Sequence, residues 1–239
     1  MGQKNNILIL GDGLLSNSLR ELKNIPYISR KKDNIDIRNV ESYINYLDGI
    51  DIVINCIANT DTYSLNKELH WDINYKAVAD LVDICNEKNI KLIHISTDYI
   101  YANSNEDAKE TDIPVHHKSW YGYTKLIGDA YIELKSNNYL IIRTGHKPYP
   151  FPYENATISV IGNFDYVHNN AKLILKLIKN ECTGIFNIGS EKKTIYQLAI
   201  KSVPDIKPVI GLPKKEMPND ISMDLTKLKT HLNYGKKDK

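Results

Sequence analysis

A tyrosine and a lysine lie four residues apart in the stretch SWYGYTKLIGDAYIEL, which begins at Ser119. If this stretch is helical, Tyr121 and Lys125 lie on one face, because residues four apart on a helix are neighbours. A lysine ammonium beside a phenol stabilises the phenolate and lowers the tyrosine pKa from about 10 toward neutral pH. Such a pair could act as a general acid that donates a proton to a substrate oxygen. The alternative is two ordinary helix residues, because the chain contains 16 tyrosines.

A hydroxyl at the end of a predicted strand favours the catalytic interpretation. The apolar run KLIHIS predicts a buried strand that leads into Thr97 and Asp98. Open α/β sheets bind their ligands at the carboxyl ends of such strands. We expect the Thr97 hydroxyl to bond the oxygen to which Tyr121 donates, so Thr97, Tyr121 and Lys125 form the candidate catalytic set. His94, inside the strand, is expected to be an ordinary core histidine.

A glycine turn near the start of the chain predicts a dinucleotide site. GDGLLS follows an apolar run and has the form G-x-G-x-x-G, with Ser16 in the third glycine position. Gly11 would allow the tight turn, and Gly13 would let the backbone approach a pyrophosphate. The phosphates would then rest on the N–H groups of Leu14 and Leu15 at the start of the next helix. A plain glycine turn is the alternative.

The stretch SRKKD, at residues 29–33, bears on which dinucleotide is bound. NAD enzymes usually carry an acidic residue at this place, where it bonds the ribose hydroxyls. The cations Arg30 and Lys31 would instead suit a 2′-phosphate, which favours NADPH. Asp33 keeps NADH as an alternative cofactor. A further alternative is that this stretch is a solvated loop that binds no ligand.

Short apolar runs alternate with segments of helical period along the chain. The runs predict strands at 6–10, 26–29, 51–56, 91–96, 139–143 and 184–188. The segments predict helices at 13–23, 40–48, 68–88, 119–136 and 166–180, and TIYQ at 194–197 has the form of a capping box. This alternation predicts βαβ units and an α/β fold with a doubly wound parallel sheet. The proline-rich stretch 146–156 and residues 211–220 are expected to be loops.

Composition narrows the remaining classes of function. The chain has 239 residues, 42% of them apolar and 25% charged, which is typical of a globular protein. A net charge of +2 without a basic stripe argues against nucleic acid, and no apolar run is long enough to span a membrane. Cys56, Cys85 and Cys182 form no metal or disulfide pattern, which fits a reducing cytoplasm. The adjacent His116 and His117 point in different directions, so no metal site is expected.

Several stretches resemble one enzyme family. ILILGDGLLSNSL, DIVINCIANTDT, LIHISTDYIY and WYGYTKLIGDAY are similar to the extended short-chain dehydrogenase/reductase superfamily. Within it, the chain looks like the dTDP-4-dehydrorhamnose reductase family of sugar-nucleotide ketoreductases, and the likeness covers most of its length. STDY together with YGYTK is the specific part. The resemblance implies a Rossmann core over residues 1–145. Residues 146–239 would complete that core and form a small C-terminal substrate lobe.

The resemblance also implies roles for individual residues. Thr97, Tyr121 and Lys125 would be the catalytic triad, and Lys125 would also hold the nicotinamide ribose. The residues implied near the cofactor's adenine and in its cleft are Asp36, Ile37, Cys56, Ile57 and Ala58. The residues implied to contact the sugar are Thr60, Thr62, Asp98, Tyr99 and His146.

The activity implied is NADPH-dependent reduction of a nucleotide-linked 4-keto-6-deoxy sugar. Hydride would go to the keto carbon and Tyr121 would donate the proton, in a pathway of dTDP-rhamnose or polysaccharide synthesis. One alternative is a sugar-nucleotide epimerase with tightly bound NAD. The other is a non-catalytic subunit that binds NADP or a sugar nucleotide, which the short region after HKPYPFPY favours. Homodimers are common in the superfamily.

Overall fold

The computed structural model describes residues 5–102, 106–112, 119–214 and 216–234. The chain forms two compact units: unit 1 is Met1–Ser96 with Ser119–Ile141, and unit 2 is Thr97–Lys118 with Ile142–Lys239. The segment 97–118 therefore belongs with the C-terminal half of the chain. The ranges 1–145 and 146–239 stay a prediction.

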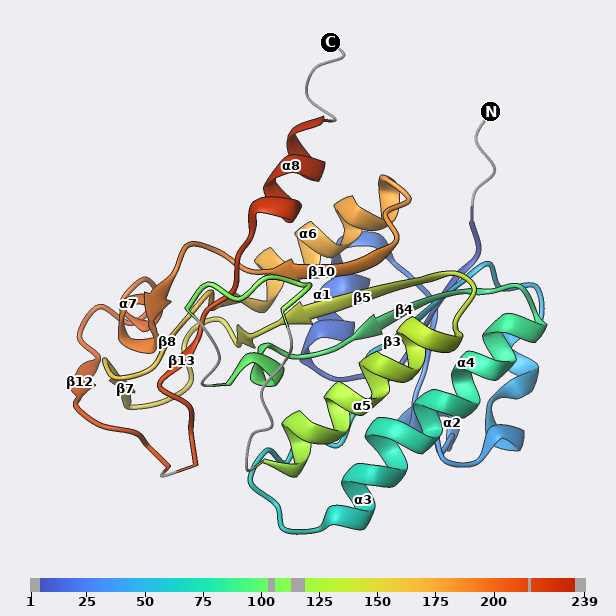
Figure 1. Cartoon of the computed structure of the whole chain (residues 1–239), viewed down its shortest axis with the longest axis horizontal. Helices are drawn as coiled ribbons and strands as arrows, with labels where there is room; N and C mark the ends of the chain where they lie inside the picture. The colour runs from blue at the N-terminus through green and yellow to red at the C-terminus, as the bar shows by residue number, and fades with distance from the viewer. Residues whose placement is uncertain (1–4, 103–105, 113–118, 215, 235–239) are drawn as a thin grey trace. The chain divides into compact units, whose positions relative to one another are not determined.

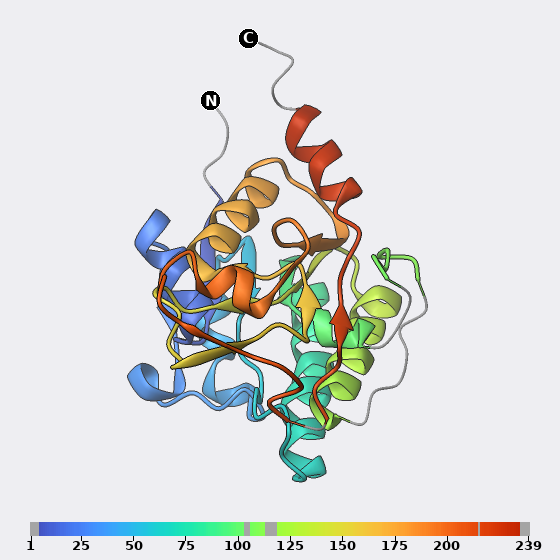
Figure 2. The same cartoon turned by 90° about the vertical axis from the view of Figure 1, so that its left-hand side faces the viewer.

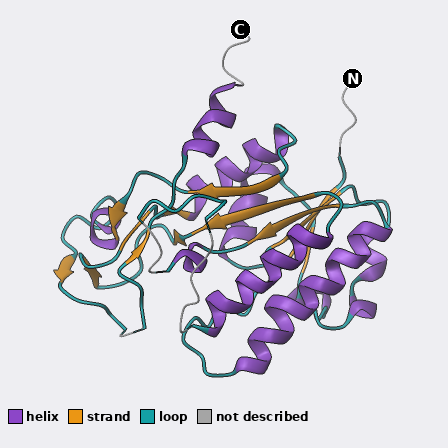
Figure 3. Ribbon diagram, viewed as in Figure 1, coloured by secondary structure: helices purple, strands orange, loops and turns teal. Residues whose placement is uncertain are grey.

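Unit 1 is built on parallel strands. The strands that begin in it are β1 (Ile7–Leu10), β2 (Tyr27–Ile28), β3 (Ile52–Asn55), β4 (Lys91–Ile95) and β5 (Tyr139–Thr144). β1 pairs in parallel with β2 and β3, and β3 pairs in parallel with β4. The order of the main sheet is β10-β5-β4-β3-β1-β2, and its long strands are orange in Figure 3.

Helical segments connect these strands. They are α1 (Leu14–Lys23), α2 (Arg30–Asp33), the 3-10 helices η1 (Val40–Ser42) and η2 (Ile44–Leu47), α3 (Lys67–Trp71), the π-helical turn η3 (Asp72–Lys76), α4 (Ala77–Glu87) and α5 (Trp120–Lys135). Figure 1 draws α4 and α5 side by side in front of the strands of unit 1, with α1 behind them.

Burial on both faces explains the composition of the strands. All four residues of β1 and all four of β3 are buried, as a strand covered by helices on both sides requires. The predicted α/β class and the parallel, Rossmann-type sheet are confirmed. Each strand predicted in unit 1 is present, with ends that differ by at most one residue.

The α-helix predicted over 40–48 was wrong. This segment forms η1 and η2, which are separated by Tyr43 with φ −136° and ψ −10°. The Ser42 hydroxyl donates to the carbonyls of Asp36 (3.0 Å) and Asn39 (2.7 Å) and accepts from the Asp36 N–H (3.0 Å). A side chain that bonds nearby backbone groups in this way competes with regular helix formation.

The helix predicted over 68–88 is present but interrupted. It consists of α3, the π turn η3 and α4, which follow one another without a break in the chain. Within η3 the Asn74 side chain accepts from the Asn59 N–H (2.8 Å) and donates to the Asn59 carbonyl (3.1 Å). It also donates to Thr124 Oγ1 on α5 (3.2 Å). A π turn at such a residue is frequent near functional sites.

Unit 2 contains shorter elements. They are η4 (Asp98–Tyr101), β6 (His146–Lys147), β7 (Asn155–Thr157), β8 (Ile161–Gly162), β9 (Asp165–Tyr166), α6 (Val167–Lys179), β10 (Gly184–Ile188), β11 (Lys193–Thr194), α7 (Ile195–Ala199), β12 (Lys207–Val209), β13 (Asp220–Ile221) and α8 (Thr226–Tyr234). The short strands form small sheets with the orders β11-β8-β13, β12-β7 and β6-β9. In Figure 2 these strands are drawn in yellow to red.

A separate apolar cluster forms the core beneath these small sheets. Phe151, Phe164 and Tyr166 are among its buried members, and Leu198 of α7 packs with them. The capping box predicted at residues 194–197 is confirmed, because Thr194 Oγ1 accepts from the Gln197 N–H (3.1 Å) and Gln197 Oε1 accepts from the Thr194 N–H (2.8 Å). The loop predicted over 146–156 contains β6 and the start of β7.

Candidate functional site

Lys125 lies in the middle of α5 and is almost completely buried, with 1% of its surface exposed. Its Nζ donates to the Ile95 carbonyl at the end of β4 (2.7 Å) and lies 2.8 Å from His94 Nε2. Burial disfavours the charged amine and lowers the pKa of Lys125 to about 8. Asp129 and Cys56 act in the opposite direction. The sequence therefore supplies a lysine that changes its charge near physiological pH.

Tyr121 lies one turn before Lys125, in the first turn of α5. The helix begins there because Ser119 caps it: its hydroxyl accepts from the Gly122 N–H (3.5 Å) and donates to the Thr62 carbonyl (2.6 Å). The Tyr121 ring is half-buried, and its centroid lies 6.5 Å from that of His70. The helix expected to carry Tyr121 and Lys125 is present, while their catalytic roles stay a prediction.

Two further contacts hold α5 in place, one to the residue after β4 and one to η3. Ser96 Oγ donates to Asp129 Oδ2 (2.8 Å), and both side chains are buried. Gly128 allows α5 to approach η3 closely, because a Cβ atom there would lie 2.6 Å from the Asn74 carbonyl oxygen. These contacts fix the rotation of the helix, and with it the direction in which Lys125 points.

The glycine turn has the geometry that a bound pyrophosphate needs. Gly11 has φ +105°, and a Cβ atom there would lie 3.1 Å from Ile57 Cγ1. Gly13 precedes α1 and provides no side-chain cap, and a Cβ atom there would meet none of the described atoms within 4 Å. The space beside Gly13 is therefore open at the N-terminus of α1, where Leu14 is exposed and Leu15 is buried.

Ser16 explains how the turn tolerates the missing third glycine. Its side chain is fully buried, and its Oγ donates to the Gly11 carbonyl (2.6 Å). The hydroxyl thus bonds the turn itself, and helix α1 still packs closely on the sheet. This compensation is the physical reason why serine can stand where the motif has glycine.

Arg30 and Lys31 lie on α2, a single turn that follows β2 directly. This helix was not predicted; Ser29 caps it by accepting from the Lys32 N–H (3.1 Å), and Asp33 Oδ2 accepts from the Ser29 N–H (2.9 Å). Both Arg30 and Lys31 are exposed. Their charges are therefore accessible to an anion, while Asp33 is engaged in the cap.

Asp36 and Ile37, expected near the adenine, differ in their surroundings. Asp36 accepts from Arg38 through Nε (2.9 Å) and Nη2 (2.5 Å). The hydrogen bond from Arg38 lowers the pKa of Asp36 to about 2. Ile37 is buried, with 4% of its surface exposed. The Asp36 carboxylate therefore has a cation as its partner within the protein.

The segment after β3 carries the residues expected in the cofactor cleft and near the sugar. Cys56, Ile57 and Ala58 are partly buried, and burial raises the pKa of the Cys56 thiol to about 12. Thr60 is exposed, and Thr62 Oγ1 donates to its carbonyl (3.2 Å). Together with the glycine turn, Asp36, Tyr121 and Lys125, these residues lie in unit 1.

The remaining predicted residues lie in unit 2. Thr97 caps η4 by accepting from the Tyr99 N–H (3.2 Å), and its hydroxyl donates to Asp98 Oδ1 (3.3 Å). Asp98 is buried against Gly145, and burial raises its pKa to about 6. Its Oδ2 and His146 Nδ1 have no hydrogen-bond partner among the described residues. Burial lowers the pKa of His146 to about 4.

Sequence reasoning missed several residues around these positions. Asn55, whose Nδ2 lies 3.3 Å from His94 Nδ1, carried no signal, and neither did Asp129 or Lys147, because each acquires its role only from tertiary neighbours. The pKa of Lys147 is lowered by burial, while Asp98 nearby raises it. His94 is buried as expected, but it bonds Lys125 as well as packing in the core.

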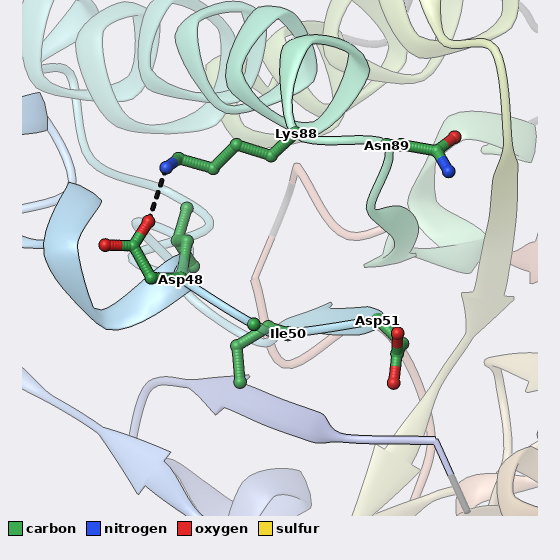
Figure 4. Close-up of a pocket in the computed structure, with 7 residues that line it drawn as sticks. Asp48, Ile50, Asp51, Lys88 and Asn89 are labelled. Carbon is green, nitrogen blue, oxygen red and sulfur yellow. Dashed lines mark hydrogen bonds and ion pairs between the residues drawn. The ribbon is translucent and has the colours of Figure 1, made fainter. Parts of the chain in front are cut away.

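Other features of the described residues lie away from these positions. No group of three His, Cys, Asp or Glu side chains there could hold a metal ion, and His116 and His117 lie outside the described residues. A polar pocket of about 350 Å³ opens beside β3, where Lys88 Nζ donates to Asp48 Oδ1 (2.6 Å) (Figure 4). It lies at the amino end of β3 and contains none of the predicted residues. None of the described helices is long and apolar enough to cross a membrane.

The chain is similar to several known proteins. The family described as "RmlD substrate binding domain" matches residues 5–146. The chain is 33% identical over 114 residues to "Probable low-salt glycan biosynthesis reductase Agl14" of Haloferax volcanii, a match covering 46% of this chain and 38% of that protein. It is 28% identical over 151 residues to a dTDP-4-dehydrorhamnose reductase of Aggregatibacter actinomycetemcomitans, a match covering 61% of this chain and 46% of that protein. The chain thus spans less than half the length of these two curated relatives.

A solved structure shows the same fold. The dTDP-4-dehydrorhamnose reductase of Bacillus anthracis in complex with NADP superimposes with a TM-score of 0.81 at 22% identity. The superposition covers 95% of this chain and 93% of that one. At this identity the likeness establishes the fold.

Proposed function

The chain belongs to the RmlD substrate-binding-domain family, and from this membership we propose that it is an NADPH-dependent reductase of a nucleotide-linked 4-keto-6-deoxy sugar. The observation that carries the proposal is the buried Lys125 one helical turn after Tyr121 on α5. A relative named dTDP-4-dehydrorhamnose reductase makes dTDP-4-dehydrorhamnose the first substrate to test. The product would enter polysaccharide synthesis, as the name of a Bacillus subtilis relative, spore coat polysaccharide biosynthesis protein SpsK, suggests for that protein.

The glycine turn supports NADPH as the cofactor. The open space beside Gly13 at the start of α1 fits a pyrophosphate, and the exposed Arg30 and Lys31 fit a 2′-phosphate. The NADP in the related Bacillus anthracis structure supports the same choice. When bound, NADPH supplies the hydride that reduces the keto carbon.

The residues of this chain would donate the proton and bind the substrate. Tyr121 would donate its phenolic proton to the keto oxygen, and the Lys125 ammonium would stabilise the phenolate that remains. Thr97 would orient the substrate oxygen through its hydroxyl. Thr60, Thr62, Asp98, Tyr99 and His146 would bind the sugar nucleotide. A positioned general acid of this kind accelerates a reaction by about 10²–10⁴-fold.

Cellular location and assembly belong to the same proposal. Within the described part of the chain, the cysteines Cys56, Cys85 and Cys182 form no disulfide, which is typical of a reducing compartment and supports a cytoplasmic location. A homodimer stays a prediction from the superfamily.

The test is loss of NADPH absorbance with dTDP-, UDP- and GDP-linked 4-keto-6-deoxy sugars. We expect wild-type protein to oxidise NADPH with one of them. Tyr121→Phe should keep NADPH affinity and lose at least about tenfold in turnover, the lower limit for a positioned acid. Tyr131→Phe, on the same helix, is the control and should keep wild-type turnover.

Each other outcome has a defined meaning. Turnover that survives in Tyr121→Phe would show that Tyr121 is not the acid. Binding of NADPH without oxidation by any sugar would favour the non-catalytic binding subunit, and copurified NAD would favour the epimerase.

A further inference from the structure

Three buried side chains form a chain of contacts across unit 1. Asn55 ends β3, His94 lies on β4 and Lys125 lies on α5, and each has 1% or less of its surface exposed. Asn55 Nδ2 lies 3.3 Å from His94 Nδ1, and His94 Nε2 lies 2.8 Å from Lys125 Nζ. Both imidazole nitrogens are thus in contact with a nitrogen that normally donates.

The backbone fixes the orientation of the Asn55 amide. Its Oδ1 accepts from the Ile57 N–H at 3.0 Å, and only an oxygen can accept there. The amide NH₂ therefore faces His94 Nδ1. Because an amide NH₂ only donates, Nδ1 has to be the acceptor and carries no proton.

This assignment leaves the imidazole proton on Nε2, facing Lys125. A neutral imidazole has one N–H donor and one acceptor nitrogen, and burial holds the pKa of His94 well below 6.5. A charged Lys125 has three donors and no acceptor, so it could not accept from Nε2–H. A neutral Lys125 amine satisfies both contacts, because its lone pair accepts from His94 while it donates to the Ile95 carbonyl.

Protonation of Lys125 therefore requires a change in His94. The imidazole proton would have to move to Nδ1, so that Nε2 could accept from the ammonium. Nδ1–H would then face the Asn55 NH₂, and that hydrogen bond would be lost. Two other titratable groups act on the Lys125 charge. Asp129 on α5 favours the ammonium, and the Cys56 thiol after β3, with its pKa raised to about 12, would favour it only once ionised.

We propose that Asn55 and His94 are positioning residues that hold one imidazole tautomer against Lys125 and so set the charge of its amine. The role rests on the proposed function, because the charge of Lys125 is what would assist Tyr121. Activity should fall as the pH rises through the pKa of Lys125, which burial places at about 8. When His94 is not held in this tautomer, the loss of activity should occur at a higher pH.

The first measurement is the tautomer of His94 in wild-type protein without cofactor, read from the ¹⁵N shifts of its two ring nitrogens above pH 8. We expect the proton on Nε2 and none on Nδ1. A proton on Nδ1 would overturn the proposal, and this result needs no variant and no activity.

Two variants then test control of the Lys125 charge. The charge is monitored through the ¹³Cε chemical shift of Lys125 as the pH is varied. In His94→Gln the uncharged amide can turn its oxygen toward the ammonium, so the pKa of Lys125 should rise by about one unit, a tenfold gain in proton affinity. In Asn55→Asp the carboxylate can accept from Nδ1–H, so His94 should change tautomer and the pKa should also rise. The exposed Lys135, on the same helix, provides the control signal in each protein.

The outcomes separate this inference from the proposed function. An unchanged pKa of Lys125 in His94→Gln, with His94 of Asn55→Asp still protonated on Nε2, would overturn the inference even in an active reductase. The expected shifts in a protein that reduces no sugar would support the inference and count against the reductase. In an active protein, the fall of kcat/KM at alkaline pH should occur at a higher pH in both variants.

Discussion

Arg30 and Lys31 are two exposed cations on a helix of one turn, next to the strand end where a dinucleotide ribose is expected. If they bind a 2′-phosphate, their removal should affect only the cofactor that has one. We expect the double variant Arg30→Ala/Lys31→Ala to weaken NADPH binding by about tenfold or more, the value of one charge-assisted hydrogen bond. NADH binding should change little, as measured by titration of nicotinamide fluorescence.

A matched lysine outside the proposed site provides the control. Lys23 is exposed at the end of α1, and Lys23→Ala should leave both dissociation constants unchanged. An equal loss of NADPH and NADH in the double variant would contradict the assignment of a 2′-phosphate to these residues.

Individual residues could be predicted from the sequence where spacing along one element decides their relation. Tyr121 and Lys125 share α5 because four residues make about one helical turn. The contact of His94 with Lys125 joins β4 to α5, and no spacing in the sequence indicates it. The engagement of Asp36 by Arg38 also escaped prediction, because it depends on how a loop folds back.

At the scale of elements, the π turn η3 is the feature that holds the segment following β3. Asn74 in this turn bonds both backbone groups of Asn59 and also Thr124 on α5. One side chain thereby joins a turn, a loop and a helix. The loop it holds leads directly to Thr60 and Thr62, which are proposed to contact the sugar.

Asn74→Ala should therefore destabilise unit 1 and loosen this loop. The partly buried Asn59 N–H loses its partner, so we expect a loss of about 1–3 kcal/mol in the free energy of unfolding. Urea unfolding measures this loss, and hydrogen exchange at the Asn59 amide should become faster. Asn45→Ala, at an exposed position on η2, should stay within about 0.5 kcal/mol of wild type. Equal stability of the two variants would show that the Asn74 bonds contribute nothing.

The elements that the sequence predicted best are those with one strong physical cause. Buried strands such as β1 and β3 need unbroken apolar runs, and these are visible in the sequence. Segment 40–48 has apolar residues at helical spacing, but the Ser42 hydroxyl bonds the backbone and prevents a regular helix. Helix α2 was missed because it has no buried residue and depends on its cap.

At the scale of the whole molecule, the chain passes between the units at Ser96–Thr97, Lys118–Ser119 and Ile141–Ile142. The last passage lies inside β5, whose first half belongs to unit 1 and whose second half belongs to unit 2. Because β5 is continuous, unfolding of either unit would leave the half-strand in the other unit without its continuation. This shared strand predicts that the two units unfold together.

Tryptophan fluorescence can test this prediction, because Trp71 and Trp120 both lie in unit 1. A reporter for unit 2 is Tyr153→Trp in a background in which both tryptophans are phenylalanine; the Tyr153 ring lies 5.4 Å from Phe151 of the unit 2 core. We expect the same urea midpoint from both reporters and from circular dichroism. Two separate midpoints would show that the units are independent.

The interleaved path also sets an order of events on the ribosome. Unit 1 has all of its residues once Ile141 has emerged, while most of unit 2 has still to be synthesised. The segment 97–118 emerges before that point, yet its partners come later: Tyr101 bonds Arg143 and Asn187, and Ala108 pairs with Met223. A nascent chain thus carries this segment unpaired, tethered at both ends to a unit that can already fold. Premature termination after unit 1 would leave that tethered segment permanently without its partners.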